Sequence, residues 1–321
     1  MNPVIECVPN FSEGRRPEVI EAIATAIAGR PEDGGPADTA GEGVRILHID
    51  RGEAANRTVI TFAGAPEAVC EAAFRGVREA ARLIDMRTQH GTHPRLGATD
   101  VLPLVPVQGI SLEECAKLAR QLAQRIWIEL GIPCYCYGAA AASPDRSELS
   151  WCRKGEYEAL AAKLADPVLR PDFGPGTVSA HIAHTGATNV GARPFLIAVN
   201  FNLRPDEQAG LAAAKAIARR MRGPGCKAIG WYIEEYGCAQ VSMNLTDTSL
   251  APLHEVYEKV CREAEAEGWR ISGTEIIGLV PRQVLLDAGN GSLEAAIRRL
   301  HLDDLRPFLP EEKVLENLLP I

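Results

Sequence analysis

The 321-residue chain has 46% apolar and 24% charged residues, an ordinary balance for a globular protein, and its length suggests two domains. Its net charge of -8 argues against a general nucleic-acid binder, although local arginines can still bind an anionic ligand. No run of about 18 apolar residues and no signal-peptide pattern is present, so we expect no transmembrane helix and no membrane partner. Nine cysteines without a CxxC pair favour reduced thiols in a cytoplasmic protein.

The first hundred residues alternate between strand and helix patterns. Apolar residues two apart predict strands, and apolar residues three and four apart predict helices. The Pro-, Gly- and Asp-rich stretch 30–43 is expected to be a flexible loop. The predicted order is strand, helix, strand, strand, helix, strand, at residues 5–12, 17–27, 44–50, 57–64, 66–84 and 101–107. This is the split βαβ, or ferredoxin-like, order.

An additional helix and strand follow this unit. Ser111 and Glu114 form a capping box that predicts the start of a helix, and Gly131 predicts its end. A strand is expected over 132–140, and residues 141–170 show an irregular, partly helical pattern.

The second half of the chain repeats the ferredoxin-like order. Its predicted elements are a strand at 194–203, a helix from Pro205 to about 222, strands at 226–235 and 239–245, a helix at 250–267, a strand at 271–281 and short helices in the tail. The sequence therefore predicts an α+β protein of two αβ subdomains, 1–186 and 187–321, each with helices on one face of its sheet. A small-molecule crevice is expected between them.

The segment 85–100, DMRTQHGTHPRLGATD, combines many ionisable side chains with no helix or strand period, which predicts a loop with a functional role. His93 is its main candidate residue. Arg95 can supply positive charge beside it, and Asp85 or Asp100 could orient its ring. An ordinary surface loop with an ordinary histidine explains the composition about equally well.

The segment 172–195, DFGPGTVSAHIAHTGATNVGARPF, is Gly-rich and has no steady period. We interpret it as the link between the subdomains. Its backbone could approach a ligand closely and offer N–H groups to it. A plain interdomain linker is the alternative interpretation.

Two histidine pairs raise the possibility of a metal site. His90 and His93 lie in an irregular loop, His181 and His184 lie in the Gly-rich segment, and neither pair carries the glutamate of an HExxH motif. We therefore expect no metal. A non-catalytic ligand-binding module is a second alternative, because paired ferredoxin-like domains can act as sensors.

Several motifs between about Ile5 and Asp287 resemble the glutamate formiminotransferase family. They are ECVPNFSEGRRPEVIEAI, NRTVITFAGAPEAV, LIDMRTQHGTHPRLGATDVLPLVPV, GEYEAL, DFGP, GATNVGARPFLIAVNFNL, GWYIEE and GLVPR. The resemblance implies transfer of a formimino group from N-formimino-L-glutamate to the co-substrate tetrahydrofolate, in histidine breakdown. It also implies a homodimer and two αβ subdomains that enclose a folate tunnel. Animal members carry a fused cyclodeaminase domain for which this chain is too short, so a stand-alone transferase is expected.

The resemblance also assigns site residues by position. His93 matches the acid/base histidine of the family, and Asp50 matches an acidic residue near the active site. The segment that lines the folate site implies contacts from Gly174, Pro175, Gly176, Thr177, Gly186, Ala187 and Thr188. The chain departs from the family pattern by a longer loop at 30–43 and by a few additional residues before Gly186, which leaves contacts within 176–185 open.

Formimino transfer needs two proton transfers but neither a redox step nor a metal. The N5 amine of tetrahydrofolate attacks the amidine carbon, a tetrahedral intermediate forms, and the glutamate amine leaves. One imidazole with a pKa near ~6.5 can accept the first proton and donate the second, which is typically worth about 10² to 10⁴ in rate. We expect His93 to be this shuttle, with loss of activity below about pH 6.

Both substrates carry carboxylates, so arginines are expected to bind them. Arg57, Arg95 and Arg193 are the candidates, together with Arg87. Arg95 and Arg193 are the strongest, because each adjoins a motif selected on other grounds. A related activity on 5-formyltetrahydrofolate would use the same residues and stays open.

Overall fold

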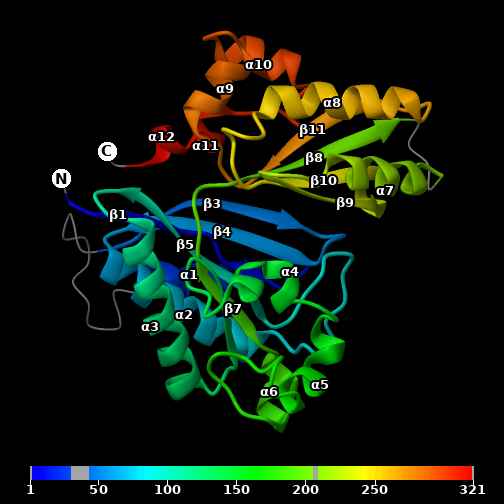
Figure 1. Cartoon of the computed structure of the whole chain (residues 1–321). Helices are drawn as coiled ribbons and strands as arrows, with labels where there is room; N and C mark the ends of the chain where they lie inside the picture. Colours follow the sequence, from blue (N-terminus) through cyan, green and yellow to red (C-terminus); the bar gives the residue numbers. More distant parts are fainter. Residues whose placement is uncertain (1, 30–42, 205–208, 320–321) are drawn as a thin grey trace. The chain divides into compact units, whose positions relative to one another are not determined.

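The computed structural model describes residues 2–29, 43–204 and 209–319, which form two compact units, Met1–Arg193 and Pro194–Ile321 (Figure 1). The predicted loop at 30–43 lies almost wholly outside the described residues, as does Pro205, the expected start of a helix. Within the described part of the chain, no helix has the length and apolar character needed to cross a membrane.

The first unit contains the predicted ferredoxin-like order and an extension of it. Its elements are β1 (Val4–Cys7), β2 (Asn10–Phe11), α1 (Pro17–Ala28), β3 (Arg45–Gly52), β4 (Arg57–Gly64), α2 (Pro66–Leu83), β5 (Thr99–Gln108), α3 (Leu112–Leu130), β6 (Cys134–Gly138), η2 (Pro144–Ser147), α4 (Leu149–Cys152), η3 (Tyr157–Ala159), α5 (Leu160–Ala165), α6 (Ala180–Thr185) and β7 (Thr188–Ala192).

The predicted strand 5–12 is divided into β1 and β2, which both lie between β4 and β5. Together with β3 these strands form the antiparallel ferredoxin-like sheet. Beyond β5 the sheet continues through β7 to β6, and these three strands are parallel. The connection from β5 to β6 runs through α3, as a parallel crossover requires.

The three long helices of this unit cover one face of the sheet (Figure 1). Helix α1 begins at Pro17 and buries Val19, Ile20 and Ile23 at helical spacing. Helix α3 begins with the predicted capping box and ends at Gly131 in the left-handed conformation. Their apolar faces and the inward residues of the strands form the main hydrophobic core.

The opposite face of β5, β7 and β6 is also covered. Val101, Tyr135 and Tyr137 form a smaller core there with residues of the short helices, namely Cys152, Leu160, Leu164 and Ile182. The expectation of helices on one face therefore holds for α1 to α3, whereas the irregular segment 144–185 packs on the other side.

Most of the Gly-rich segment 172–195 belongs to the first unit, and only its last residues link the two units. It contains α6 and β7, and β7 is an interior strand that pairs with both β5 and β6. The division between the units therefore follows β7, at Arg193 and Pro194, whereas the expected division at 186 and 187 precedes it.

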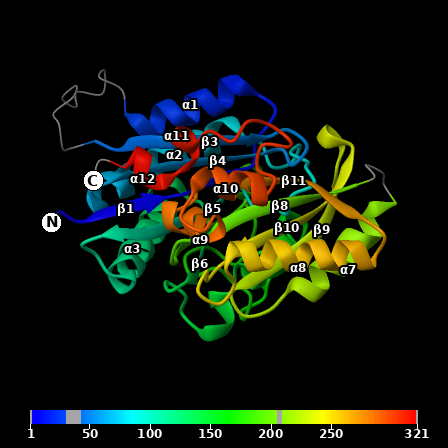
Figure 2. The same cartoon turned by 90° about the horizontal axis from the view of Figure 1, so that it is seen from above.

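The second unit repeats the plan in a four-stranded antiparallel sheet with the order β11-β8-β10-β9. Helices α7 and α8 cover the same face of this sheet (Figure 2). The elements are β8 (Ile197–Arg204), α7 (Gly210–Met221), β9 (Cys226–Ile233), η4 (Glu234–Tyr236), β10 (Cys238–Leu245), α8 (Leu253–Ala266), β11 (Arg270–Ile277), α9 (Arg282–Ala288), α10 (Leu293–Arg299), α11 (Pro310–Lys313) and α12 (Leu315–Leu318). The predicted α+β class with two related αβ units is thus confirmed.

The close packing of α7 on β9 depends on Gly230. A Cβ atom at this position would lie 2.3 Å from the backbone nitrogen of Lys215 in α7. We predict that Gly230→Ala lowers the free energy of unfolding by about 1–3 kcal/mol or more, because the helix must move away from the strand. The measurement is urea denaturation, with Gly223→Ala as the control, because a Cβ there meets no atom within 4 Å. Equal stability of the two variants would contradict this packing.

Candidate active site

The face of the first sheet that points away from α1 to α3 carries a row of polar side chains. Side chains alternate along a strand, so the core positions Ile5 and Cys7 place Glu6 on this opposite face. On β4, the core position of Ile60 places Arg57 there in the same way. We call this side of the sheet the polar face.

A β-bulge brings Asp100 to the polar face. Asn10 pairs with Val101 and Phe11 pairs with Thr99, so Asp100 is an extra residue on β5. A bulge of this kind redirects a side chain that regular alternation would place elsewhere. The carboxylate of Asp100 is completely buried.

Two arginines bind the buried Asp100 carboxylate. Arg57 Nη1 lies 2.6 Å from Oδ2, and Arg153 donates from Nη2 to Oδ2 at 2.6 Å and from Nε to Oδ1 at 3.3 Å. The backbone N–H of Leu96 also donates to Oδ1, at 3.0 Å. Burial alone would raise the pKa of Asp100, but Arg153 and Arg57 together lower it below its ordinary value. Asp100 is therefore an anion, and the two guanidinium groups around it leave a net positive charge.

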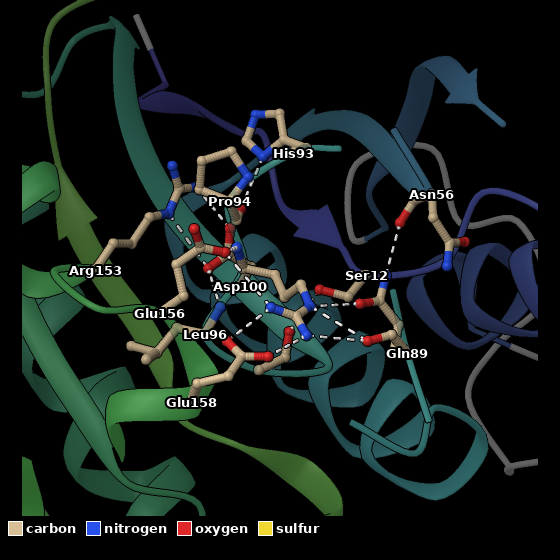
Figure 3. A network of polar contacts seen from close by, with 12 residues as sticks. Ser12, Asn56, Gln89, His93, Pro94, Leu96, Asp100, Arg153, Glu156 and Glu158 are labelled. Atoms are coloured by element: carbon tan, nitrogen blue, oxygen red, sulfur yellow. Dashed lines mark hydrogen bonds and ion pairs between the residues drawn. The ribbon is translucent and has the colours of Figure 1, made fainter. Parts of the chain in front are cut away.

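His93 lies beside this charged group (Figure 3). Its Nδ1 is 2.8 Å from the carbonyl oxygen of Pro94, which also accepts from Arg57 Nη1 at 3.3 Å. A carbonyl oxygen can only accept a hydrogen bond, so Nδ1 carries the hydrogen. In the neutral ring, Nε2 then has the lone pair that can accept a proton.

The surroundings of His93 keep its ring neutral. Burial, followed by the positive charges of Arg57 and Arg153, lowers the pKa of His93 well below its ordinary value. Asp100 and the Pro94 carbonyl oppose this effect without reversing it. We expected His93 to titrate near its ordinary pKa. Its lowered pKa means instead that the ring stays neutral to a lower pH.

The other ionisable groups of the loop hold it in place. Arg95 donates to both carboxylate oxygens of Glu158, at 2.7 and 3.0 Å, and to Gln89 Oε1 at 2.9 Å (Figure 3). Asp85 pairs with Arg87 at 2.6 Å, and its Oδ2 is 3.5 Å from Nδ1 of His184 in α6. Through these contacts Arg95 connects the loop to η3. Its expected contact with folate stays a prediction.

Asp50 lies on the polar face at the edge strand β3. It pairs in register with Val59, two residues beyond Arg57 on β4, and its Oδ2 is 3.6 Å from Nε2 of His48. Both side chains are mostly buried. The structure thus places Asp50 on the same side of the sheet as His93 and Asp100, and its role in catalysis stays a prediction.

Arg193 lies directly after β7, at the opposite end of the polar face from Asp50. Its side chain is hydrogen-bonded to Tyr137, and burial raises the pKa of Tyr137 to about 12 although Arg193 and Arg153 oppose this. Tyr137 is also close enough to Arg57 to influence its pKa. It therefore connects the surroundings of Arg193 with the two arginines that bind Asp100.

The predicted folate-binding glycines divide into two groups. Gly174, Pro175, Gly176 and Thr177 lie in the partly exposed segment before α6. Gly186, Ala187 and Thr188 are buried beside the loop, and their backbone N–H groups donate to Ile182, Leu96 and Pro133. The backbone N–H groups of the second group are therefore bonded within the unit, and the expected contact of these residues with folate stays a prediction. A Cβ atom at Gly186 would lie 2.3 Å from the Leu96 carbonyl oxygen, which explains the glycine there.

The second histidine pair connects α6 to the long helices. His181 Nε2 is 2.7 Å from the Leu130 carbonyl oxygen at the end of α3, and His184 Nε2 is 3.0 Å from that of Ala81 in α2. Among residues 2–29, 43–204 and 209–319, no group of three or more His, Cys, Asp or Glu side chains is arranged to hold a metal ion.

A cavity of about 230 Å³ is lined in part by Asn56, Gln89 and Asp85, and His93 is not among its lining residues. The Glu13 carboxylate in its lining already accepts from the backbone N–H groups of Arg15 and Arg16 and from Arg16 Nε at 2.6 Å. We therefore do not assign it to the reacting groups.

Three residues at or beside the polar face were not predicted from the sequence: Arg153, Tyr137 and Glu6. Arg153 adjoins the motif GEYEAL, but its partner Asp100 lies 53 residues away. Tyr137 and Glu6 alternate with buried cysteines, in CYCYG and IEC, and this alternation was the available signal that they share a face of the sheet.

We predict that Asp100→Asn lowers the free energy of unfolding by about 3–5 kcal/mol, because two arginines would keep their charges without a buried partner. Chemical denaturation measures the change. The matched control is Glu113→Gln, whose ion pair with Lys117 is exposed and is expected to contribute little. A similar loss of stability in both variants would show that the ion pairs of Asp100 contribute no more to stability than an exposed pair.

Comparison with known proteins assigns the chain to a family. A model of the N-terminal subdomain of the formiminotransferase domain matches residues 4–193, and a model of the formiminotransferase domain matches residues 198–320. A solved periplasmic protease from Escherichia coli aligns with a TM-score of only 0.21, which supports no argument.

Relatives at 38–42% identity include both single-domain and longer proteins. The glutamate formimidoyltransferase of Streptococcus pyogenes is 38% identical over 99% of both chains. That of Thermoplasma acidophilum is 40% identical over 91% of this chain and 92% of its own length. The formimidoyltransferase-cyclodeaminase of Sus scrofa is 42% identical, and this chain spans 60% of its length. The chain therefore belongs to the formiminotransferase family.

Proposed function

We propose that the protein transfers the formimino group of N-formimino-L-glutamate to N5 of tetrahydrofolate and releases L-glutamate. Full-length similarity to proteins named glutamate formimidoyltransferase supports the reaction. The observation that carries the proposal is the state of His93. Its Nδ1–H is fixed on the Pro94 carbonyl, and its low pKa leaves Nε2 free of a proton at neutral pH.

The proposed chemistry uses this nitrogen twice. When N5 attacks the amidine carbon, the attacking amine gains positive charge and becomes a strong acid, so even a weak base can accept its proton. Nε2 accepts that proton, and the imidazolium that forms lies close to Arg57 and Arg153. Their charges make it a strong acid, so it readily protonates the departing nitrogen of glutamate. The carbon–nitrogen bond to glutamate then breaks, and His93 returns to its neutral form.

The arginines have separate proposed roles. Arg57 and Arg153 are occupied by Asp100 and set the charge around His93. Burial lowers the pKa of Arg57 to about 10, so it still carries its charge at neutral pH. Arg193 is partly exposed, and we infer that it is better placed than Arg95 to bind a substrate carboxylate. We infer a role for Asp50 in the active site from its place on the polar face.

Location and assembly belong to the same proposal. None of the nine cysteines, which all lie in the described part of the chain, forms a disulfide, and this supports a reducing compartment such as the cytoplasm. A homodimer rests on the family resemblance alone, and light scattering of the purified protein tests it.

The direct test is an activity assay. We expect the wild-type protein to form 5-formiminotetrahydrofolate, detected by absorbance after acid conversion, and His93→Ala to lose at least about a hundredfold in kcat. His254→Ala is the matched control, because His254 lies on α8 in the other unit, and it is expected to keep its activity. Saturable folate binding by a wild-type protein without transfer would replace the proposed reaction with a binding role.

The pH dependence of kcat tests the state of His93. Its neutral form is required and its pKa is lowered, so kcat at saturating substrates is expected to stay constant as the pH falls through ~6.5. The decline should begin only at a clearly lower pH. A decline centred near ~6.5 would mean that Arg57 and Arg153 do not govern the ring.

A further inference from the structure

Glu6 is a buried carboxyl group for which the mechanism above has no use. It lies in β1 on the polar face and is 1% exposed. Its Oε2 has no hydrogen-bond partner within the described residues. A buried oxygen in this state is costly, and native proteins usually supply such an atom with a donor. A glutamine or threonine would fill the same position without an ionisable group, so strand packing does not explain the carboxyl.

The described neighbours of Glu6 include one cation, and none of them donates a hydrogen bond to Oε2. The paired residues on β4 and β5, Ala63 and Val105, are apolar. Arg193, after β7, is the charged group that acts on Glu6, and Tyr137 of β6 is bonded to that arginine. Cys7 follows in the same strand but points to the helix side. Burial outweighs Arg193 and raises the pKa of Glu6 to about 7.

A carboxylate with one cation beside it and one open oxygen is suited to a pair of N–H donors. A planar N–H pair of the amidine type can donate in parallel to both oxygens of a carboxylate. Both substrates of the proposed reaction carry such a group. One is the ring N–H and adjacent amino group of the pterin in tetrahydrofolate, and the other is the formimino group itself.

The position of Glu6 favours the pterin. Glu6 precedes Asn10 by four residues, and Asn10 accepts from Arg57, which binds Asp100 beside His93. Four residues of extended chain span roughly 13 Å, so Glu6 lies along the sheet from Asn10 and the Asp100 group and not beside them. The formimino carbon must reach His93, whereas the ring N–H pair of the pterin lies at the far side of the ring from N5.

We propose that Glu6 binds the pterin ring of tetrahydrofolate by accepting hydrogen bonds from its adjacent ring N–H and amino groups. This inference rests on the proposed formimino transfer and names a substrate contact for it. Arg193 is the positioning residue, because its charge favours the ionised form of Glu6 that accepts both hydrogen bonds. Binding must therefore release the proton that Glu6 carries in the free protein at mildly acidic pH.

The test is isothermal titration with tetrahydrofolate under anaerobic conditions, in buffers of different ionisation enthalpy, which counts the protons released. For the wild type we expect release of close to one proton at pH 6 and close to none at pH 8, because the pKa of Glu6 is about 7. Glu6→Gln should release none at either pH and bind at least tenfold more weakly at pH 8. Thermal unfolding of Glu6→Gln verifies that the fold is intact, and Glu113→Gln should behave as the wild type.

Three outcomes overturn the inference: no proton release by the wild type, unchanged release in Glu6→Gln, or unchanged affinity in Glu6→Gln. The same titration with N-formimino-L-glutamate distinguishes the two donors, and release in that arm alone would move the contact to the formimino group. A second readout is kcat/KM for tetrahydrofolate, which should rise with pH through about 7 in the wild type and not in Glu6→Gln. Wild-type transfer without Glu6-linked release refutes this inference alone, whereas an absence of wild-type transfer refutes the proposed function.

Discussion

The buried carboxylate of Asp100 is the constraint on which the polar face of the first unit depends. It is completely buried and stays ionised only because Arg57 and Arg153 bind it, and each arginine comes from a different part of the chain. Neutralising Asp100 would leave two guanidinium charges without their buried partner. Asp100, Arg57 and Arg153 therefore join β5, β4 and the end of α4. Asp100 also holds the end of the loop 85–100, because it accepts a hydrogen bond from the backbone of Leu96.

The state of His93 follows from its burial and from the charge balance of this group. Burial disfavours the imidazolium form most, and the positive charge that two guanidinium groups leave around one carboxylate disfavours it further. The Pro94 carbonyl accepts from both Arg57 and the histidine ring, which couples the tautomer of His93 to the ion pair. A mild base that becomes a strong acid once protonated is suited to a reaction in which an amine first loses and another amine then gains a proton.

Sequence patterns predicted the regular elements well and the site only in part. Helices α1 to α3 show clear periods and begin at Pro17, Pro66 and the Ser111 cap, so local signals define them. Strand β7 is short, and its residues TNVGA show no apolar alternation, which is why it was interpreted as a linker. The contact of Arg153 with Asp100 depends on a bulge in β5 and on packing between distant segments. Neither leaves a pattern along the sequence, whereas His93 was found because its loop concentrates ionisable residues.

The most direct test of this account is a nitrogen NMR titration of histidine-labelled protein, with His93→Ala used to assign the resonances. We predict that His93 keeps its hydrogen on Nδ1 and an unprotonated Nε2 from neutral pH to below ~6, and that Arg153→Met raises its pKa. A His93 that titrates near ~6.5, or that carries its hydrogen on Nε2, would contradict the claim that its burial and the Asp100 group keep His93 a neutral base.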